Sequence, residues 1–504
     1  MKKALLRPQH VEHLERAAAA QKKRRYDRVA QRARLTKHIG FKRTGFFGVI
    51  AMTIVTSLLA GLGAYGLGLG MPSASKADPL EVELRAAVTA AKVEPIREPT
   101  FLPSTEQIAL GETLFFDKIL SGNKDISCAG CHQLAQHSAD ALPLSIGTGG
   151  VHTGPERELG PDRDFIPRHS PDIFNRGVDG WNTLLWDGRI HGDSVTGIVI
   201  PESAEPIPGL THVLAGQVMS TVLNRAEMRG NRDDFGANFL PNDLGVVPDD
   251  APQVVWDTLM NRLMSLDGYR QLFRQAYPGI PPSQLRFQDA ANAVAAFELA
   301  YLTMDESPFD RWLRGESEVL DSDAKKGAVL FYGKAQCAQC HSGTLMTDQS
   351  FHNIGVPQLR PVTSDKPLDL GRQAITGDPA DLFAFRTPPL RNVALTAPYM
   401  HDGTIPTLEA AVRLHLNPEE ALRGYAVRQL RADLRPAYRG EAETITDILG
   451  TLDPRIVHPP ELSRTEMHQL MAFLNALTDP RAMDLTEHVP TVPEIPSAIK
   501  PTYE

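Results

Sequence analysis

The chain has 504 residues, 42% of them hydrophobic, with a formal net charge of −9 and only four cysteines. This length is enough for roughly three domains, and the apolar content is sufficient for buried cores, which excludes a disordered or fibrous protein. The acidic charge lies almost entirely beyond residue 45, so the body of the chain is poorly suited to binding nucleic acid.

The N-terminal segment 1–45 is strongly basic, with 14 lysines and arginines against three acidic residues. The uncharged residues 46–70 follow it and are long enough to span a bilayer. A basic flank before an apolar span predicts a transmembrane helix, with the N-terminus in the cytoplasm and the remainder outside. Ser75-Lys76-Ala77 also fits a cleavage site, so removal of the span is an alternative to a permanent anchor.

Residues 71–103 are rich in proline, alanine and charge, and we expect a linker with one helical piece near Leu80–Val93. Two later segments are similar to each other: Gly-Glu-Thr-Leu-Phe-Phe at 111–116 and Gly-Ala-Val-Leu-Phe-Tyr at 327–332. Each has apolar residues at helical spacing and leads into a pair of cysteines. This weak internal repeat predicts a duplicated domain.

All four cysteines lie in two Cys-x-x-Cys-His motifs, Cys128–His132 and Cys337–His341. This is the attachment pattern of haem c, in which two thiols hold the porphyrin and the histidine binds the iron. A redox or zinc site would explain one such motif, but two motifs beyond an export segment favour two covalently bound haem c groups. We expect Cys128, Cys131, Cys337 and Cys340 to attach them, with His132 and His341 as iron ligands.

Further apolar periodicity predicts helices over Asp289–Met304 and Leu462–Leu477, and strand signals are sparse. The predicted fold class is therefore mostly α, with two duplicated cytochrome c-like haem domains after the N-terminal transmembrane helix. The predicted parts are a basic segment 1–45, an anchor or signal 46–70, a linker 71–103, an N-terminal haem domain 104–315, a C-terminal haem domain 316–480 and a proline-rich tail 481–504.

From about Pro103 to Pro480 the chain resembles the bacterial di-haem cytochrome c peroxidase and MauG-type superfamily. The resemblance rests on ordered blocks: Leu110–Asp117, Ser127–His132, Ser145–Gly147, Trp186–Arg189, Glu227-Met228, Asp369–Arg372, Phe385–Asn392 and Thr396–Gly403. It implies that the haem on His132 reacts with peroxide and that the haem on His341 transfers electrons.

One departure concerns the first haem. Many family members carry a removable distal histidine sixteen residues after the proximal one, and this chain has Thr148 there. Threonine is a poor iron ligand, so we expect the first haem to keep an open position. His137 and His152 lie nearby in the sequence and are alternative iron ligands. We expect both instead to be solvent-exposed loop residues.

The resemblance assigns three further residues to peroxide chemistry. Glu227 matches the distal acid–base carboxylate, and Gln217, ten residues earlier, matches its hydrogen-bonding companion. An insertion at Ile190–Gly216 makes the alignment of Gln217 the less secure of the two. Trp186 would lie between the haems and relay electrons.

The resemblance also implies a sixth ligand for the second haem, fourteen residues after His401, which is His415. Bis-histidine ligation by His341 and His415 would give this haem a lower potential than a histidine–methionine pair. Met400 and His401 are alternative ligands. A calcium ion is usual in the family, and the matching positions are Thr396, Pro398 and His169, where the family commonly has asparagine.

These inferences favour a periplasmic di-haem peroxidase, anchored to the inner membrane unless the span is cleaved. It would reduce hydrogen peroxide to water with electrons from a small cytochrome c or cupredoxin. One alternative is a MauG-like enzyme that uses peroxide to oxidise a side chain of a partner protein. A non-enzymatic di-haem electron carrier is another. Family members are often homodimers, and this state is left open.

Overall fold

The computed structural model describes residues 78–499 apart from 98, 100–101, 204, 237–239, 365, 458–459 and 490–493. Contacts divide the chain into two units, and the described residues belong to the second, Ala77–Glu504. The basic segment 1–45 and the predicted span 46–70 lie outside the described residues. Within the described part, no helix combines the length and the apolar character needed to cross a membrane.

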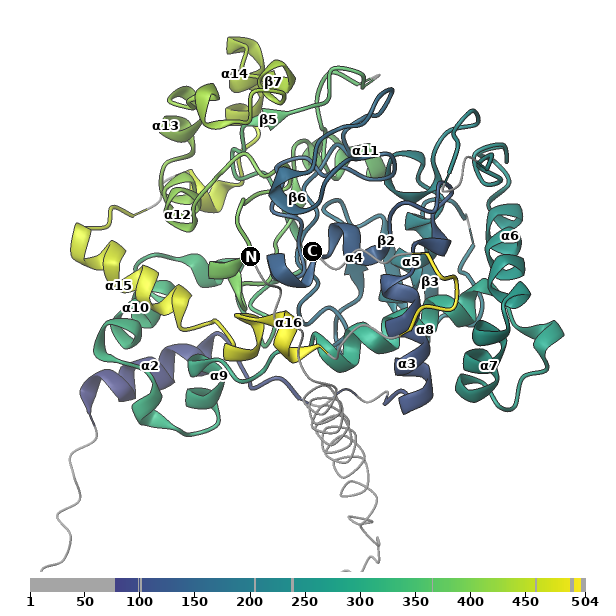
Figure 1. Ribbon diagram of the computed structural model, residues 1–504. Coiled ribbons are helices and arrows are strands. Elements are labelled where there is room, and N and C mark those ends of the chain that lie inside the picture. Colours follow the sequence, from purple (N-terminus) through teal and green to yellow (C-terminus); the bar gives the residue numbers. More distant parts are fainter. Residues whose placement is uncertain are drawn as a thin grey trace, which may run out of the picture. The chain divides into compact units, whose positions relative to one another are not determined.

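Most of the regular structure is helical, which confirms the mostly α prediction (Figure 1). The helices are α2 (Pro79–Ala90), α3 (Thr105–Phe116), α4 (Cys128–Cys131), α5 (Val213–Thr221), α6 (Pro252–Ser265), α7 (Asp267–Ala276), α8 (Phe287–Tyr301), α9 (Pro308–Leu313), α10 (Ser322–Tyr332), α11 (Gln373–Thr376), α12 (Leu408–Leu416), α13 (Pro418–Arg423), α14 (Ala442–Gly450), α15 (Arg464–Asn475) and α16 (Leu485–His488).

The strands are short and form three small antiparallel sheets. One sheet has the order β1-β2-β3, and the other two are the pairs β4-β6 and β5-β7. Their bounds are β1 (Thr183–Leu184), β2 (Ile190–Asp193), β3 (Gly197–Val199), β4 (Phe351–His352), β5 (Gln358–Leu359), β6 (Phe385–Arg386) and β7 (Tyr438–Arg439).

The two similar segments identified in the sequence lie at equivalent helix crossings. In α3, a Cβ atom on Gly111 would come within 1.8 Å of the Ala293 carbonyl oxygen in α8. In α10, a Cβ atom on Gly327 would come within 1.8 Å of the Gln469 carbonyl oxygen in α15. The repeat therefore preserves a close approach of two backbones just before each cysteine motif (Figure 1).

Helix ends follow from the local sequence. Ser104 caps α3 and Ser463 caps α15, each in a capping box with a polar residue three positions later. The helices predicted over Asp289–Met304 and Leu462–Leu477 are observed as α8 and α15, with bounds that differ by up to three residues. Helix ends are the least certain feature of a periodicity analysis because the capping residue decides them.

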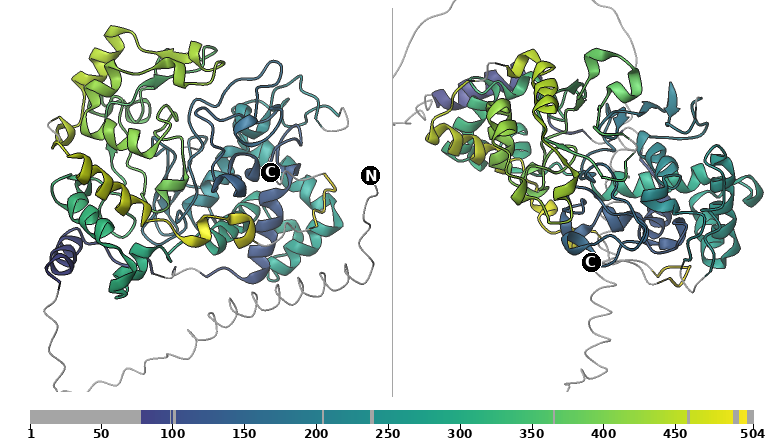
Figure 2. Two further views of the ribbon diagram at one scale, coloured as in Figure 1. Left: turned by 60° about the vertical axis from the view of Figure 1, so that its left-hand side comes forward. Right: turned by 90° about the horizontal axis from the view of Figure 1, so that it is seen from above.

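The two ends of the described chain pack against cores from the opposite half of the sequence. Leu84 and Val88 of α2 lie in a core with α9, α10 and α15. Ala482, Leu485 and Ile495 lie in the core built around α3 and α5–α8. Figure 2 shows the yellow C-terminal segment beside these blue and teal helices. The domain boundaries 104–315 and 316–480 remain predictions. The segments on either side of them, α2 and the C-terminal residues, pack into the two cores.

Candidate active site

The first cysteine motif forms one helical turn, α4, in which Cys128 and Cys131 share one face because they are three residues apart. The His132 amide closes the turn on the Cys128 carbonyl oxygen at 2.9 Å. His132 Nδ1 lies 3.0 Å from the Ser138 carbonyl oxygen. This contact favours a proton on Nδ1 and leaves Nε2 as the basic nitrogen, which is the arrangement that a metal-binding imidazole needs.

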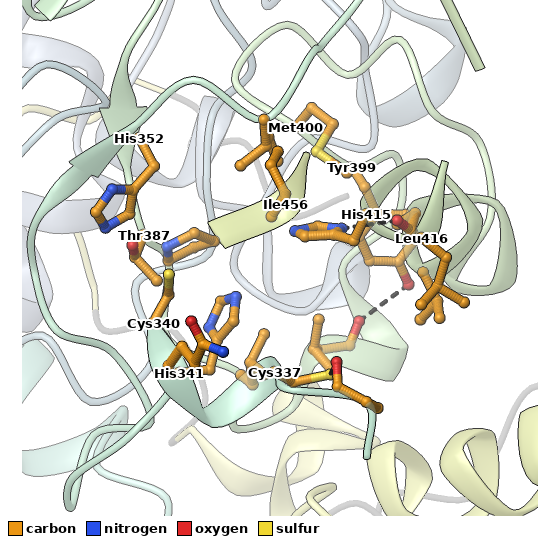
Figure 3. Close-up of a pocket in the computed structure, with 18 of the residues that line it drawn as sticks. Cys337, Cys340, His341, His352, Thr387, Tyr399, Met400, His415, Leu416 and Ile456 are labelled. Carbon is orange, nitrogen blue, oxygen red and sulfur yellow. Dashed lines mark hydrogen bonds between the residues drawn. The ribbon is translucent and has the colours of Figure 1, made fainter. Parts of the chain in front are cut away.

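The second motif is arranged in the same way, with a second histidine facing it. His341 Nδ1 lies 3.2 Å from the Met346 carbonyl oxygen. His415, on α12, has its Nδ1 2.8 Å from the Ala411 carbonyl oxygen one turn earlier. The two imidazole centres are 6.3 Å apart, and Figure 3 shows the rings entering one cavity from different elements.

This separation fits two imidazoles on opposite faces of one metal ion. A metal–nitrogen bond of about 2 Å and roughly 1 Å from nitrogen to ring centre, counted for each ligand, give about 6 Å. Of the alternatives, Met400 lines the same cavity, and the His401 ring instead stacks on Phe385 at 3.4 Å. The geometry therefore favours His415 as the partner of His341.

The cavity around the second motif has a volume of about 1410 Å³, including the space open at its mouth, and its walls are largely apolar. A cavity with mostly apolar walls and a few convergent polar side chains suits the flat, apolar ring of a porphyrin. Two side chains in its wall, Arg386 and His401, are almost fully buried. Among the described residues, Arg386 Nη1 and both ring nitrogens of His401 have no hydrogen-bond partner.

These unpaired polar atoms are further evidence that the cavity accommodates haem. A buried guanidinium with a free N–H group costs free energy unless an anion pairs with it, and a porphyrin carries two carboxylates. The sequence blocks include Arg386 and His401, but adjacency in sequence does not reveal that both face one cavity. Arg455 and Ile456, which belong to none of the sequence blocks, also line it.

The loop that carries Thr148 is held by buried polar contacts. Thr148 Oγ1 donates to Asp125 Oδ1 at 2.8 Å and accepts from Asn123 Nδ2 at 2.9 Å. Its amide donates to the Glu227 carbonyl oxygen at 2.8 Å. Arg157 donates to the carbonyl oxygens of Ile146 and Gly147 at 2.9 and 2.7 Å. The Thr148 hydroxyl is thus used within the loop, which is consistent with a threonine that does not bind the iron.

Glu227 lies in a π-helical turn, Arg225–Arg229, capped by Asn224. Its carboxylate accepts from Asn224 Nδ2 at 3.0 Å. Burial, with a smaller contribution from the nearby Glu202, raises the pKa of Glu227 to about 7 against the opposing charge of Arg189. Glu227 also affects the pKa of Cys131, so its carboxylate is near the first motif.

Gln217 lies on α5, and Trp186 lies in the turn between β1 and β2. Gln217 is half-buried on α5, and its side chain has no hydrogen bond within the described residues. Trp186 lines the second cavity, and its indole Nε1 donates to the His169 carbonyl oxygen at 3.0 Å. His169 is itself close enough to His132 for the two to interact electrostatically. Trp186 therefore lines the second cavity and bonds to the backbone of a residue near His132.

The alternative ligands of the first haem have other contacts. His137 Nδ1 lies 2.9 Å from the Ala482 carbonyl oxygen, and His152 is exposed. Of the calcium positions, Thr396 is buried, and the His169 ring is paired with the Leu142 carbonyl oxygen at 2.7 Å. Within the described residues, the side chains clustered closely enough for a metal ion are instead Cys340, Asp348 and His352. Calcium at Thr396 and Pro398 stays a prediction.

Comparisons with known proteins agree with this site. The family described as di-haem cytochrome c peroxidase matches residues 105–318. The methylamine utilization protein MauG of Methylorubrum extorquens is 30% identical over 397 residues, which cover 78% of this chain and 85% of the relative. Cytochrome c551 peroxidase of Pseudomonas aeruginosa is 31% identical over 424 residues, which cover 82% of this chain and 97% of the relative.

Solved structures show the same fold. A crystal structure of a MauG-like protein associated with microbial copper homeostasis has a TM-score of 0.52 and 28% identity, covering 78% of this chain and 95% of that one. The di-haem peroxidase BthA of Burkholderia thailandensis has a TM-score of 0.51 and 20% identity, covering 79% and 90%, which supports the fold alone. The chain therefore belongs to the di-haem cytochrome c peroxidase and MauG family, whose members carry two haem c groups.

Proposed function

We propose that this protein reduces hydrogen peroxide to water with electrons from a small redox protein such as cytochrome c. The observation that carries the proposal is the difference between its two cysteine motifs. A second histidine, His415, faces His341 across the cavity. Near His132, the loop position that could supply a distal histidine is Thr148, whose hydroxyl is already hydrogen-bonded.

When bound, the two haem c groups supply the one-electron chemistry between donor and peroxide. Cys128, Cys131 and His132 would hold one group. Cys337, Cys340, His341 and His415 would hold the other, with Arg386 and His401 facing its carboxylates. Trp186 would relay electrons between the two sites, because it lines the second cavity and its indole donates to the carbonyl oxygen of His169.

Glu227 would move the proton that peroxide cleavage requires. Its carboxylate takes a proton from the inner oxygen of peroxide and returns it to the outer oxygen, which leaves as water. A pKa of about 7 makes both steps accessible near neutral pH. Gln217 would orient the peroxide by hydrogen bonding, because it matches the family position and its amide has no hydrogen bond within the described residues.

Two measurements test the proposal. A ferric spectrum should contain a high-spin component that disappears on addition of stoichiometric peroxide, and reduced cytochrome c should sustain peroxide consumption. Two purely low-spin haems would instead support a non-enzymatic di-haem electron carrier. Such a result would mean that His137, His152 or another group closes the first site.

The second candidate is oxidation of a side chain in a partner protein. It is favoured by the Thr148 loop and by the similarity to the methylamine utilization protein MauG. Negligible turnover with reduced cytochrome c, beside a rapid reaction with peroxide, would support this candidate over the peroxidase.

We also infer a periplasmic location, because haem c is attached outside the cytoplasm and residues 46–70 can export or anchor the chain. Carbonate extraction of membranes would separate a retained anchor from a cleaved signal. A calcium ion near Thr396 and Pro398 and a homodimer belong to the same proposal, and calcium removal with sedimentation analysis would test both.

A further inference from the structure

The segment Ile190–Gly216, which lengthens the chain between Arg189 and Gln217, folds onto helix α5. Its strands β2 and β3 pair antiparallel, with His191 opposite Val199. A Cβ atom on Gly216 would come within 2.8 Å of Ile198 Cγ2 and 3.2 Å of Ile190 Cγ2. The hairpin therefore lies directly on α5, and the absence of a side chain at Gly216 allows this contact.

This packing places Glu202, which follows the hairpin, against the last turn of α5. Glu202 Oε1 accepts from Ser220 Oγ at 2.9 Å. The Glu202 side chain is exposed to solvent, whereas Ser220 is buried. The next residue, Thr221, hydrogen-bonds to the Glu227 carboxylate. The hydroxyl groups of two consecutive residues thus contact one carboxylate each, and Glu202 is close enough to Glu227 to raise the pKa of Glu227.

The charged groups around this path interact with one another. The pKa of Glu202 is raised by burial on its packed side and lowered by Arg189, and the same arginine opposes the effect of burial on Glu227. Arg189 is held in place through its Nε atom, 3.1 Å from Asp187 Oδ1. Of these groups, Glu202 is the carboxylate with open access to water.

We propose that Glu202 is a proton-relay residue that takes protons from solvent and passes them along the last turn of α5 to Glu227. The proposal rests on the proposed peroxide reduction. In that reaction one H₂O₂, two electrons from the redox protein and two protons give two molecules of water. The transfer that Glu227 makes between the two oxygens consumes no proton, so both protons must come from solvent in every turnover.

The substitution Glu202→Gln tests the relay, because the amide oxygen can still accept from Ser220 but cannot carry a proton. We expect kcat for peroxide reduction to fall about tenfold, while the second-order rate constant for the first reaction with peroxide changes less than about twofold. Glu202→Asp should recover most of kcat. Glu205→Gln, an exposed neighbour in the same segment, is the matched control and should match the wild type.

A proton-relay role also predicts that a proton-donating buffer restores kcat in the variant, which a purely structural role of Glu202 would not. In Glu202→Gln, kcat should rise with the concentration of phosphate buffer, which can supply protons to the opened path, whereas the wild type should respond weakly. The relay would be overturned if kcat of Glu202→Gln equalled the wild-type value between about pH 5 and 9. Equal losses in kcat and in the second-order rate constant for the reaction with peroxide would also overturn it. A wild-type protein that does not consume peroxide would instead refute the proposed function.

Discussion

Glu227 is the residue on which the proposed chemistry depends most directly. It is half-buried in a π-helical turn, with Asn224 Nδ2 3.0 Å from its carboxylate. Burial raises its pKa to about 7, whereas a carboxyl group in water titrates about three units lower. A group that must first accept and then return a proton works best when its pKa is close to the working pH.

We expect Glu227→Gln to lower the second-order rate constant for the reaction with peroxide by about 10²–10³-fold, since the amide cannot accept the proton. Stopped-flow absorption would measure it. Glu298→Gln is a suitable control, because Glu298 is also buried near the first motif and its pKa of about 8 already keeps it protonated at neutral pH. Equal losses in both variants would point to disturbed haem attachment.

The same residue predicts a pH dependence. Only the ionised carboxylate can take a proton from peroxide, and a raised pKa keeps Glu227 protonated in mildly acidic solution. The rate constant for the reaction with peroxide should therefore rise with pH through about 7 and then level off. A profile that is flat over this range, or one that persists in Glu227→Gln, would exclude Glu227 as the proton acceptor.

His415 permits a separate test at the second site. Thioether ligation stabilises the reduced haem more than imidazole does, so His415→Met should raise the reduction potential of this haem by on the order of 0.1 V. Potentiometric titration followed by absorption would measure the shift. His468→Met changes an exposed histidine and should leave both potentials unaltered. An unchanged potential in His415→Met would show that another residue is the ligand.

At the scale of elements, the two glycine crossings provide the clearest relation between sequence and packing. Gly111 and Gly327 each face a backbone carbonyl oxygen of the crossing helix at a distance that leaves no room for a side chain. Both helices precede a cysteine motif, so their positions determine where the motif lies in its core. A change at either crossing should therefore affect both stability and haem attachment.

Gly111→Ala and Gly327→Ala should each destabilise the protein by roughly 1–3 kcal/mol, because the helices must move apart. Thermal unfolding of the haem-loaded protein would measure the loss. Gly450→Ala is the control: Gly450 is also helical, but a Cβ atom there meets nothing within 4 Å, so alanine should be neutral or slightly stabilising. Three equal melting temperatures would contradict the crossing argument.

Some structural features could be predicted from the sequence alone, and others could not. Helices α3, α8 and α15 could be predicted because their apolar spacing and caps are local features, and the cysteine motifs are contiguous. The contact of Glu202 with Ser220 could not, because it depends on how a hairpin packs on α5. The unpaired nitrogens of Arg386 and His401 could not be predicted either, since nothing local indicates which cavity they face.

For the whole molecule, the main finding is that each end of the described chain stabilises the half that is distant in sequence. In α2, Glu81 accepts from the Trp312 indole at 3.0 Å, and Arg85 lies over that ring at 4.4 Å. At the other end, Ser497 Oγ donates to Asp117 Oδ1 at 2.7 Å. Composition indicated a linker and a tail here, because proline-rich segments carry little periodicity even where they are packed.

Removal of residues 494–504 should therefore weaken the core around α3, far from the deletion in sequence. It would expose the site of Ile495, which is 8% accessible, and take a hydroxyl from the buried Asp117, which would retain its bond from Tyr269 at 2.6 Å. Burial of one isoleucine and a hydrogen bond to a carboxylate together contribute about 3–5 kcal/mol. That is a large part of an ordinary domain's stability of ~5–15 kcal/mol, so the melting temperature should fall by several degrees. The point variant Ser497→Ala removes only the hydrogen bond and should show a smaller decrease. If the truncated protein melted like the wild type and kept both haems, the tail would have no structural role in the core around α3.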